Sequence, residues 1–152
     1  MKRAFDVIVA LFGLAALSPV MLVIAVCLRA SVGSPVFFRQ RRPGFRGVPF
    51  QLVKFRTMRD LVDAHGELLP DAARLTRYGR FLRATSLDEL PELWNVLCGQ
   101  MSLVGTRPLL MEYVPLYTPQ QARRHEARPG ITGLAQVSGR NAIGWDERFS
   151  LD

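Results

Sequence analysis

The feature that most constrains this chain is a run of 22 residues without a formal charge, from Val7 to Leu28. As a straight α-helix this run would be about 33 Å long, roughly the hydrocarbon thickness of a bilayer. The run is apolar on every side of such a helix, which suits lipid or the centre of a large protein. Only 124 residues (152 minus 28) come after it, too few to surround the helix completely. We therefore predict that it lies in a membrane.

A cleaved signal peptide is one alternative for this segment. It would have a shorter apolar region, followed by a cleavage site of small residues. In this chain Arg29 follows Leu28 directly, and no Ala-x-Ala site precedes it. The interpretations that remain are an ordinary transmembrane anchor and a helix that enters and leaves the bilayer on one side.

Ser18 and Pro19 interrupt the middle of the run. Pro19 has no N–H to donate to the carbonyl of Ala15, and its ring clashes there, so we expect a kink. The Ser18 hydroxyl can bond back to a carbonyl one turn earlier and partly compensate for the lost hydrogen bond. A kink at mid-depth favours a helix that turns back within the bilayer.

Basic residues flank the segment on both sides, and the positive-inside rule assigns such flanks to the cytoplasm. A kinked helix that enters and leaves on one face satisfies both observations, although proline-kinked spans also exist. We therefore predict a re-entrant membrane helix over residues 1–30, with residues 31–152 on the cytoplasmic side. The flanking residues are Lys2 and Arg3 before the run, and Arg29, Arg39, Arg41 and Arg42 after it.

The charge balance favours a polyanionic partner. Lys and Arg total 20 against 13 Asp and Glu, a formal net charge of +7. Such an excess suits nucleic acid, an anionic membrane or phosphorylated substrates. Lys2 and Lys54 are the only lysines, so 18 of the 20 basic residues are arginine, which binds phosphate bidentately. A GC-rich genome would produce the same bias. Without a recognised nucleic-acid-reading fold, we expect no nucleic-acid partner.

Cysteine and histidine give little support to a metal site of their own. Cys27 and Cys98 are too few for a disulfide framework or a Cys-rich zinc site. His65 and His125 lie far apart in the sequence and show no metal-ligand spacing to either cysteine. An exposed helical position is the common explanation for each histidine.

The polar remainder begins with a predicted β-hairpin. Residues 36–38 and 50–55 have strand composition and flank a turn-rich loop at 41–47. Beside a bilayer, each basic residue of this region would add about 1 kcal/mol of attraction to anionic lipid. A solvated hairpin tip is the alternative. The basic residues concerned are Arg39, Arg41, Arg42 and Arg46.

Short helices are predicted for most of the remaining chain. We expect helices at residues 60–69 and 71–81, and another from residue 118 to about 127. Thr118 suits an N-cap, with Pro119 at the first position and Gln121 at the third. These elements predict a mainly α fold with a short β-hairpin (α+β), in one functional domain, and not a parallel α/β sheet.

The stretch from residue 83 to residue 97 predicts a helix with one buried face. Pro91 is tolerated only near a first turn, so the helix should begin close to Asp88. Ser86 and Glu89 match a capping box, and acidic residues in a first turn complement the helix dipole. A helix cap alone would therefore explain these residues, without any catalytic role. The buried face would be formed by Leu87, Leu90, Leu93, Trp94 and Leu97.

A chemical interpretation of the same residues is also open. Asp88 and Glu89 are adjacent carboxylates with Arg83 and Arg107 nearby in the sequence. Mg²⁺ is held by one or two carboxylates together with substrate phosphates, and arginines neutralise the remaining oxygens. A carboxylate can also attack phosphorus directly and form an aspartyl phosphate. Spacing alone does not choose between this interpretation and the cap.

Four motifs resemble the bacterial sugar transferases, and more specifically the small monotopic polyprenyl-phosphate phosphoglycosyl transferases, which are initiating sugar-1-phosphate transferases. The likeness covers nearly the whole chain, including the apolar segment with Ser18 and Pro19, and the motifs occur in the family's order. Together they are far more specific than any one of them. They are KFRTM at 54–58, SLDELP at 86–91, MSLVGTRP at 101–108 and RPGITG at 128–133.

The resemblance implies a defined reaction. Family members move a sugar 1-phosphate from a UDP-sugar to undecaprenyl phosphate and release UMP, on the cytoplasmic face of the bacterial inner membrane. This is the first membrane step of glycan assembly, such as exopolysaccharide biosynthesis, so downstream glycosyltransferases are candidate partners. The donor sugar is open, with an N-acetylated amino sugar favoured by similarity.

The same resemblance implies a set of site residues. The family's Asp-Glu pair corresponds to Asp88, the nucleophile of a ping-pong cycle with a covalent phosphosugar intermediate, and Glu89, which would help to hold Mg²⁺ or handle protons. Both carboxylates are candidate Mg²⁺ ligands. The family's helix break corresponds to Ser18 and Pro19. Four further residues lie in the motifs, and we expect them to bind diphosphate or lipid phosphate: Lys54, Arg83, Arg107 and Arg128.

The chain also departs from the family pattern. Members usually have Pro at the position of Thr106, often Trp at that of Leu134, and often Ser or Thr at that of Gly144. They also continue past the region of Asp152 with another helical segment, so we expect the last family segment to be missing here. The competing hypothesis is a non-catalytic, basic, membrane-bound module that binds anionic lipid or a partner protein.

Overall fold

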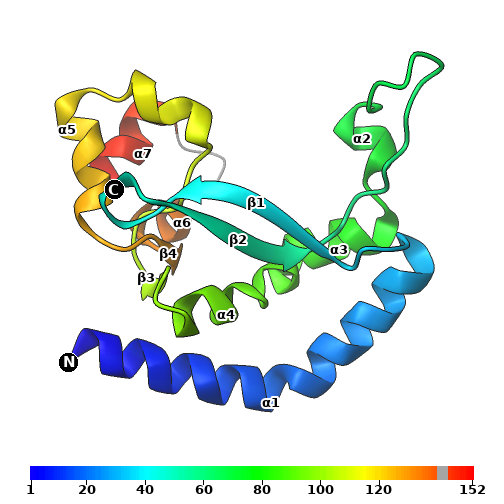
Figure 1. Cartoon of the computed structure of the whole chain (residues 1–152), viewed down its shortest axis with the longest axis horizontal. Helices are drawn as coiled ribbons and strands as arrows, with labels where there is room; N and C mark the ends of the chain where they lie inside the picture. Colours follow the sequence, from blue (N-terminus) through cyan, green and yellow to red (C-terminus); the bar gives the residue numbers. More distant parts are fainter. Residues whose placement is uncertain (140–143) are drawn as a thin grey trace. The chain divides into compact units, whose positions relative to one another are not determined.

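A computed structural model describes residues 1–139 and 144–152, and its elements are shown in Figure 1. The chain divides into two compact units. The first unit comprises residues 1–14, 40–52 and 92–152. The second unit comprises residues 15–39 and 53–91. Each unit therefore contains part of the N-terminal helix and part of the hairpin.

Helix α1 runs without interruption from Lys2 to Ser31, with Pro19 inside it. The Ser18 hydroxyl donates a hydrogen bond to the carbonyl oxygen of Ala15 at 2.8 Å, the acceptor that Pro19 cannot serve. This confirms the predicted compensation. Among the described residues, α1 is the one helix long and apolar enough to cross a membrane, and only 11% of its most apolar window is buried. An apolar helix so exposed differs from the core helix of a soluble protein.

The predicted hairpin is confirmed as β1 (Phe37–Pro43) and β2 (Pro49–Phe55). A single turn of 3₁₀-helix, η1 (Phe45–Gly47), joins the strands. The loop is shorter than predicted, because residues 41–43 lie in β1. Arg46 (φ 55°) and Gly47 (φ 74°) both take left-handed backbone angles, which reverse the chain within a few residues.

The first unit packs several short elements around one small core. Its buried residues are Ala10 of α1, Phe50 and Leu52 of β2, and Val96 and Met101. The elements are α4 (Glu92–Leu97), β3 (Ser102–Val104), η3 (Met111–Leu116), α5 (Pro119–Ala122), η4 (Arg123–Glu126), β4 (Gly130–Thr132), α6 (Leu134–Ser138) and α7 (Trp145–Leu151).

Strands β3 and β4 form a parallel pair that the sequence did not predict. Ser102 lies opposite Gly130, and Val104 lies opposite Thr132. Three-residue strands give too few alternating positions for a strand pattern to be recognised. A Cβ atom on Gly130 would lie 2.1 Å from the nitrogen of Gly105, so this close approach of two backbones requires glycine.

The predicted capping box at Thr118 is confirmed. The Thr118 hydroxyl accepts from the Gln121 N–H at 3.2 Å, and the Gln121 side chain accepts from the Thr118 N–H at 2.9 Å. The helix is shorter than expected, because α5 ends at Ala122 and continues only as the 3₁₀ turn η4.

The second unit packs the C-terminal half of α1 against α2 (Asp71–Arg74), α3 (Arg77–Thr85) and the 3₁₀ turn η2 (Leu87–Glu89). Its core contains four buried residues, which are Ile24, Leu28, Phe55 and Leu82. The prediction of one helix over residues 71–81 was wrong in extent. Thr76 starts a new helix, since its hydroxyl accepts from the N–H of Gly79 at 2.9 Å.

The predicted helix at residues 60–69 was wrong. This segment forms a turn closed by an isolated bridge between Val62 and Leu68, and a second bridge joins Met58 and Leu75 outside it. Asp63 accounts for the difference, because its carboxylate accepts hydrogen bonds from the backbone N–H groups of His65 (2.8 Å) and Glu67 (3.0 Å). Such local bonds from Asp compete with helix formation and favour a turn.

Candidate active site

The candidate carboxylates lie on a tight turn after α3. Ser86 ends that helix in the left-handed conformation (φ 58°, ψ 17°) and donates its N–H to the carbonyls of Leu82 and Arg83. Its side chain does not cap η2. The capping-box interpretation of Ser86 and Glu89 was therefore wrong. A helical turn does begin beside Asp88, but it is the 3₁₀ turn η2 from Leu87, and the α-helix begins only at Glu92. A left-handed residue between α3 and η2 reverses the chain before any cap can form.

Packing around this turn buries Asp88. Leu87 and Leu90, on either side of the pair, pack against the core of the second unit. Asp88 is consequently only 8% exposed, and the Glu89 side chain 14%. A buried carboxyl group has lost most of its hydration, which disfavours its charged form.

Two cations act on this pair. The Lys54 ammonium, on β2, lies 2.7 Å from Oε1 of Glu89. Burial raises the pKa of Asp88 above the usual aspartate value, while the Lys54 charge opposes that shift, Glu89 adds to it, and Arg83 opposes it again. Arg83 is oriented by a hydrogen bond of 2.9 Å from its Nε to the hydroxyl of Thr57. Four of the predicted site residues are thus together in the second unit.

The carboxylates offer donors of the kind that Mg²⁺ prefers. No group of three His, Cys, Asp or Glu residues within the described part of the chain could hold a metal ion. Two adjacent carboxylates, Asp88 and Glu89, nevertheless match a Mg²⁺ site completed by substrate phosphate oxygens and water. Their chemistry fits that ion, although Lys54 competes with it for Glu89.

Neither histidine occupies the exposed helical position that was expected. His65 is exposed, but it lies in the turn at Asp63 and not in a helix. His125 lies in η4 and is half-buried, and this burial lowers its pKa. The correction at His65 follows from the absence of the helix predicted at residues 60–69, and the ring of His125 lies 5.7 Å from that of Tyr117.

Arg107 lies in the first unit, on the loop after β3, and is half-buried. The carbonyl of Arg107 accepts a hydrogen bond from Nη2 of Arg124 at 2.9 Å. The hydroxyl of the preceding Thr106 donates to the carbonyl of Arg124 at 3.3 Å. A proline could not form this second bond, so Thr106 holds the loop by a contact that the usual family residue lacks.

Arg128 lies just before β4, also in the first unit. Its Nε donates to the carbonyl of Gly99 at 2.9 Å, and its guanidinium lies over the ring of Phe45 at 5.7 Å. One edge of the guanidinium is therefore engaged by the protein itself. The side chain remains exposed enough to reach an anion with its other nitrogens.

Arg42 is a residue whose place the sequence did not predict. It was assigned to the hairpin loop beside the lipid, but it lies on β1 and its Nη1 donates to the carbonyl of Pro108 at 3.2 Å. Burial lowers the pKa of Arg42, and the nearby charge of Arg107 lowers it further. Strand alternation past residue 41 was the signal that could have placed this side chain inward.

Trp94 is a second correction. It was predicted on a buried helix face, but 56% of it is exposed. The reason is that α4 begins at Glu92, after the 3₁₀ turn, which changes the phase of the helix. Glu92 and Asn95 are the residues that face inward instead, with 3% and 1% exposed.

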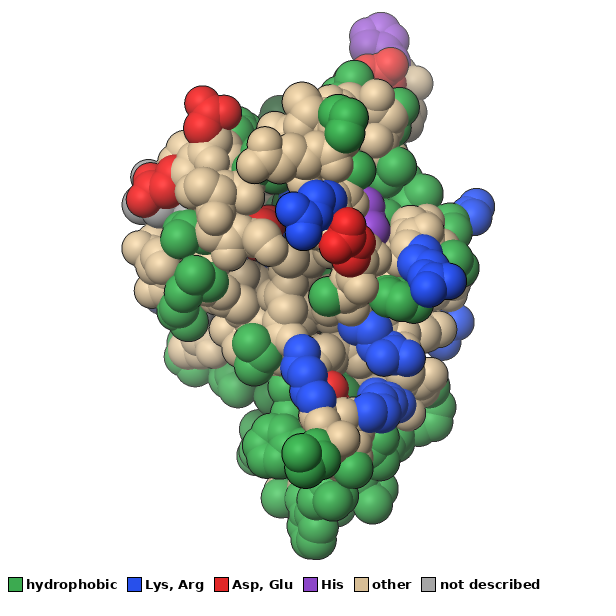
Figure 2. Space-filling model, turned by 90° about the vertical axis from the view of Figure 1, so that its left-hand side faces the viewer, with side chains coloured by type: hydrophobic (Ala, Val, Ile, Leu, Met, Phe, Trp, Pro, Cys, Tyr) green, Lys and Arg blue, Asp and Glu red, His purple; other side chains and the backbone are tan. Residues whose placement is uncertain are grey.

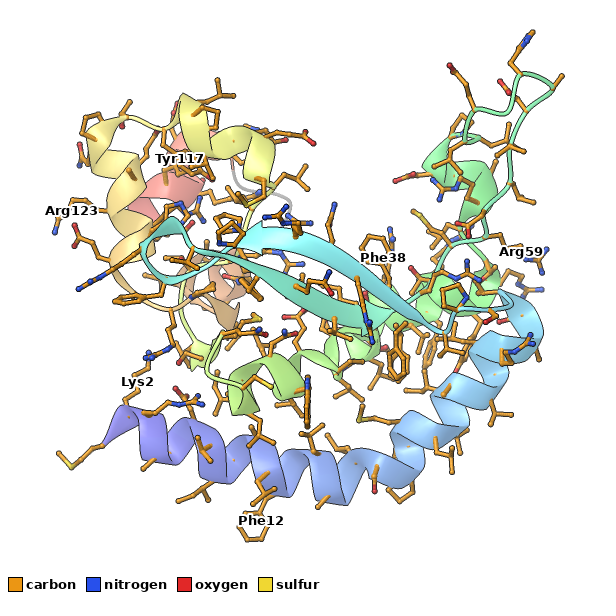
Figure 3. The ribbon with its side chains drawn as sticks, in the orientation of Figure 1. Lys2, Phe12, Phe38, Arg59, Tyr117 and Arg123 are labelled. Carbon is orange, nitrogen blue, oxygen red and sulfur yellow. The ribbon has the colours of Figure 1, made fainter. Side chains whose placement is uncertain are left out.

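The start of α1 is bound to the first unit by polar contacts. Lys2 Nζ donates to the carbonyl of Val104 at 2.9 Å. Arg3 donates to the last carbonyls of α4, those of Val96 (2.6 Å) and Leu97 (3.0 Å). Figure 3 shows Lys2 pointing from α1 toward β3, and Phe12 pointing away on the other side of the helix.

Asp6 extends this attachment and is only 4% exposed. Its carboxylate accepts hydrogen bonds from the hydroxyl of Ser102 (2.8 Å) and the N–H of Leu103 (3.2 Å). The first turns of the apolar helix are therefore part of the folded first unit.

The end of α1 is bound in the same way within the second unit. Arg59 Nε donates to the carbonyl of Ser31 at 2.9 Å. Arg56 Nη2 donates to the carbonyl of Val32 at 3.4 Å, and Leu28 is fully buried in the core. Polar parts of this chain thus bind both ends of its apolar helix.

Figure 2 shows several basic side chains close to a larger group of hydrophobic side chains. In the first unit, Lys2, Arg46 and Arg128 are exposed basic residues. The exposed hydrophobic residues at the start of α1 include Phe5 and Phe12. A basic surface next to an apolar helix is the arrangement expected at an anionic membrane.

Comparison with known proteins identifies the class. The profile of the family described as bacterial sugar transferase matches residues 1–152. The chain is 58% identical over 152 residues to the uncharacterized sugar transferase EpsL of Bacillus subtilis, covering all of this chain and 75% of the relative. It is 45% identical over 148 residues to the UDP-glucose:undecaprenyl-phosphate glucose-1-phosphate transferase of Caulobacter vibrioides, covering 91% of this chain and 54% of the relative.

A third relative is the exopolysaccharide production protein ExoY of Sinorhizobium fredii. It is 39% identical over 168 residues, covering 99% of this chain and 74% of the relative. The chain belongs to the bacterial sugar transferase family.

Proposed function

We propose that this protein transfers a sugar 1-phosphate from a UDP-sugar to undecaprenyl phosphate, with release of UMP. The observation that carries the proposal is the buried Asp88, which lies beside Lys54, Glu89 and Arg83 in a chain of the sugar transferase family. The names of relatives support both substrates, and the glucose transferase of Caulobacter vibrioides favours UDP-glucose over an N-acetylated amino sugar.

Asp88 is the proposed nucleophile. Its carboxylate oxygen attacks the phosphorus that carries the sugar, and the bond from that phosphorus to the bridging oxygen of the diphosphate breaks. UMP leaves with that oxygen, and an aspartyl phosphosugar remains. An oxygen of undecaprenyl phosphate then attacks the same phosphorus, which releases the Asp88 carboxylate. A desolvated carboxylate suits this role, because it loses little further hydration when it reacts.

The neighbours of Asp88 have separate roles in this proposal. Lys54 favours the ionised form of Asp88 by opposing the effect of burial on its pKa, and Arg83 does the same more weakly. Asp88 and Glu89 would hold Mg²⁺, which when bound supplies charge that neutralises the diphosphate. Arg107 and Arg128 are proposed to bind phosphate oxygens of the two substrates.

We further propose that α1 is re-entrant and that the protein lies on the cytoplasmic face of the inner membrane. Lys2, Arg3 and Asp6 bind the first unit, while Ser31 and Val32 are bound in the second unit. A helix with both ends held by polar parts of one chain is consistent with both ends on one side of the bilayer, because those parts do not cross lipid. Labelling of single cysteines at residues 2 and 34 tests this: both should react from the same side.

The test of the function is UMP release. The protein in detergent or nanodiscs is incubated with Mg²⁺, undecaprenyl phosphate and a panel of UDP-sugars, beginning with UDP-glucose. Repeated turnover is expected with at least one donor and only when the lipid phosphate is present in excess. A folded protein that releases no UMP with any donor would instead support the non-catalytic, lipid-binding module.

A further inference from the structure

Three consecutive backbone carbonyls around Arg107 are fixed by residues far away in the sequence. The donors come from strand β4, the turn η4 and strand β1. Such a loop cannot rotate its peptide groups without breaking a hydrogen bond at each position. The bonds are Gly130 N–H to the carbonyl of Thr106 (2.9 Å), Arg124 Nη2 to that of Arg107 (2.9 Å) and Arg42 Nη1 to that of Pro108 (3.2 Å).

Arg124 is itself held in place on several sides. It is only 6% exposed, and its guanidinium lies over the rings of Tyr117 (5.6 Å) and Phe149 (5.3 Å). Its Nη2 also pairs with Oδ2 of Asp152 at 2.5 Å. Stacking on two rings leaves the planar group little freedom. Figure 3 shows Arg123, the preceding residue, pointing outward to solvent instead. Arg124 is thus placed to bind the main chain of the loop and not a soluble ligand.

Arg42 is oriented by two acceptors. Nη2 donates to the side-chain oxygen of Gln40 at 2.7 Å, and Nη1 donates to the carbonyl of Pro108. A guanidinium offers donors in a fixed planar fork, so two bonds determine its direction. Of the single charges that act on Arg42, that of Arg107 has the largest effect on its pKa.

We propose that Arg42 and Arg124 are positioning residues, which bind the backbone of the 106–108 loop and so direct the Arg107 side chain toward a substrate phosphate. The inference rests on the proposed function. A fixed loop holds the Arg107 guanidinium ready to donate hydrogen bonds to the phosphate. It also loses less conformational entropy when the substrate binds. Two arginines thus act through a third.

Substitutions at Arg42 separate this role from direct phosphate binding. Arg42→Met removes both charge and donors, Arg42→Gln keeps an N–H donor without charge, and Arg42→Lys keeps both. If Arg42 positions the loop, Arg42→Met should lower kcat/KM by about 10- to 100-fold, whereas Gln and Lys should each restore much of that loss. If Gln is as poor as Met while Lys is near wild type, Arg42 binds phosphate directly and the proposal is wrong.

Double-mutant cycles with Arg107→Lys test whether both residues act through Arg107. In that background, Arg42→Met and Arg124→Met should each cost less activity than they do alone. Losses that simply add would contradict the proposal. Arg123→Gln is the matched control, because this exposed residue neighbours Arg124 and should leave the activity unchanged.

Hydrogen exchange supplies a measurement that does not need activity. Peptides covering residues 103–109 should exchange at least about tenfold faster in the two Met variants, while peptides of α3 should remain as in wild type. Unchanged exchange in 103–109 would overturn the proposal even if the enzyme is active. Conversely, the wild-type protein could show the predicted exchange and yet release no UMP. That result would reject the proposed function but support the fixation of the loop by Arg42 and Arg124.

Discussion

The carboxylate turn at residues 86–91 and the arginine loop at residues 105–108 are built in contrasting ways. The turn buries a charged group, and burial raises the pKa of Asp88 against the opposition of Lys54. The loop fixes its backbone, while the Arg107 side chain stays half-exposed. Under the proposed function, the difference means that the surroundings of Asp88 tune its reactivity, whereas a rigid main chain presents Arg107 for binding.

The largest effect is expected for Asp88→Asn, which tests the carboxylate turn. Loss of the nucleophile should lower turnover by at least about 10³-fold, because an amide cannot form the acyl phosphate. The measurement is UMP release, alongside thermal unfolding.

Unlike its turnover, the thermal stability of Asp88→Asn should not fall. The pKa of Asp88 is raised in the folded state, so the ionised carboxylate disfavours folding once the pH is above that pKa. Asp88→Asn should therefore unfold at the same temperature as wild type at neutral pH, or at a higher one. A lower unfolding temperature would show that the carboxylate stabilises the fold.

Lys54→Gln should have the next largest effect. Removing the ammonium raises the pKa of Asp88 further, since Lys54 is its strongest opposing charge. The acid limb of kcat/KM, which we expect above the usual aspartate range in wild type, should move to higher pH. At neutral pH the activity should fall by about 10- to 100-fold. An acid limb at the same pH in both proteins would show that Lys54 does not control the ionisation of Asp88.

Asp6→Asn probes the attachment of α1 to β3. The neutral amide can accept at only one of the two positions that the carboxylate serves, Ser102 and Leu103. A hydrogen bond to a charged group contributes about 1.5 to 3 kcal/mol, so the free energy of unfolding should fall by an amount of that order. Chemical denaturation measures it, with Leu11→Ala on the exposed side of α1 as the control.

The smallest effect is expected at Thr106. Thr106→Ala removes the hydrogen bond to the carbonyl of Arg124 and should lower kcat/KM about two- to fivefold, in keeping with the loss of one neutral hydrogen bond. Thr106→Pro should retain wild-type activity, because its ring restricts the backbone and it keeps the carbonyl that Gly130 binds. An equal loss of kcat/KM in Thr106→Ala and Thr106→Pro would mean that the Thr106 hydroxyl has a role other than holding the loop.

Some of the fold could be predicted because local patterns determine it. The apolar run specified α1, Ser18 bonded back as expected, and strand composition indicated the hairpin. The parallel pair β3 and β4 could not be predicted, because it joins residues 28 positions apart (130 minus 102) through only three residues each. The turn at Ser86 was missed for a different reason: Ser86 takes the left-handed conformation that ends α3, a position where glycine is the usual sequence signal.

The arginines also have a structural role that composition did not predict. Their number suggested anion binding, yet many of them donate to backbone carbonyls, which a guanidinium can do while also stacking or pairing. Arg42 and Arg124 could not be assigned from sequence, since their partners are main-chain atoms, which no side-chain pattern reveals. The arginines with such bonds are Arg3, Arg42, Arg56, Arg59, Arg74, Arg124 and Arg128.

The most direct test of the central claim is intact-protein mass spectrometry after incubation with UDP-glucose and Mg²⁺ without lipid acceptor. We expect a mass increase equal to one hexose phosphate on the wild-type chain, mapped to Asp88 by peptide analysis and lost when undecaprenyl phosphate is added. Asp88→Asn should carry no adduct. An adduct that persists in Asp88→Asn, or one that maps to another residue, would contradict the assignment of Asp88 as the nucleophile.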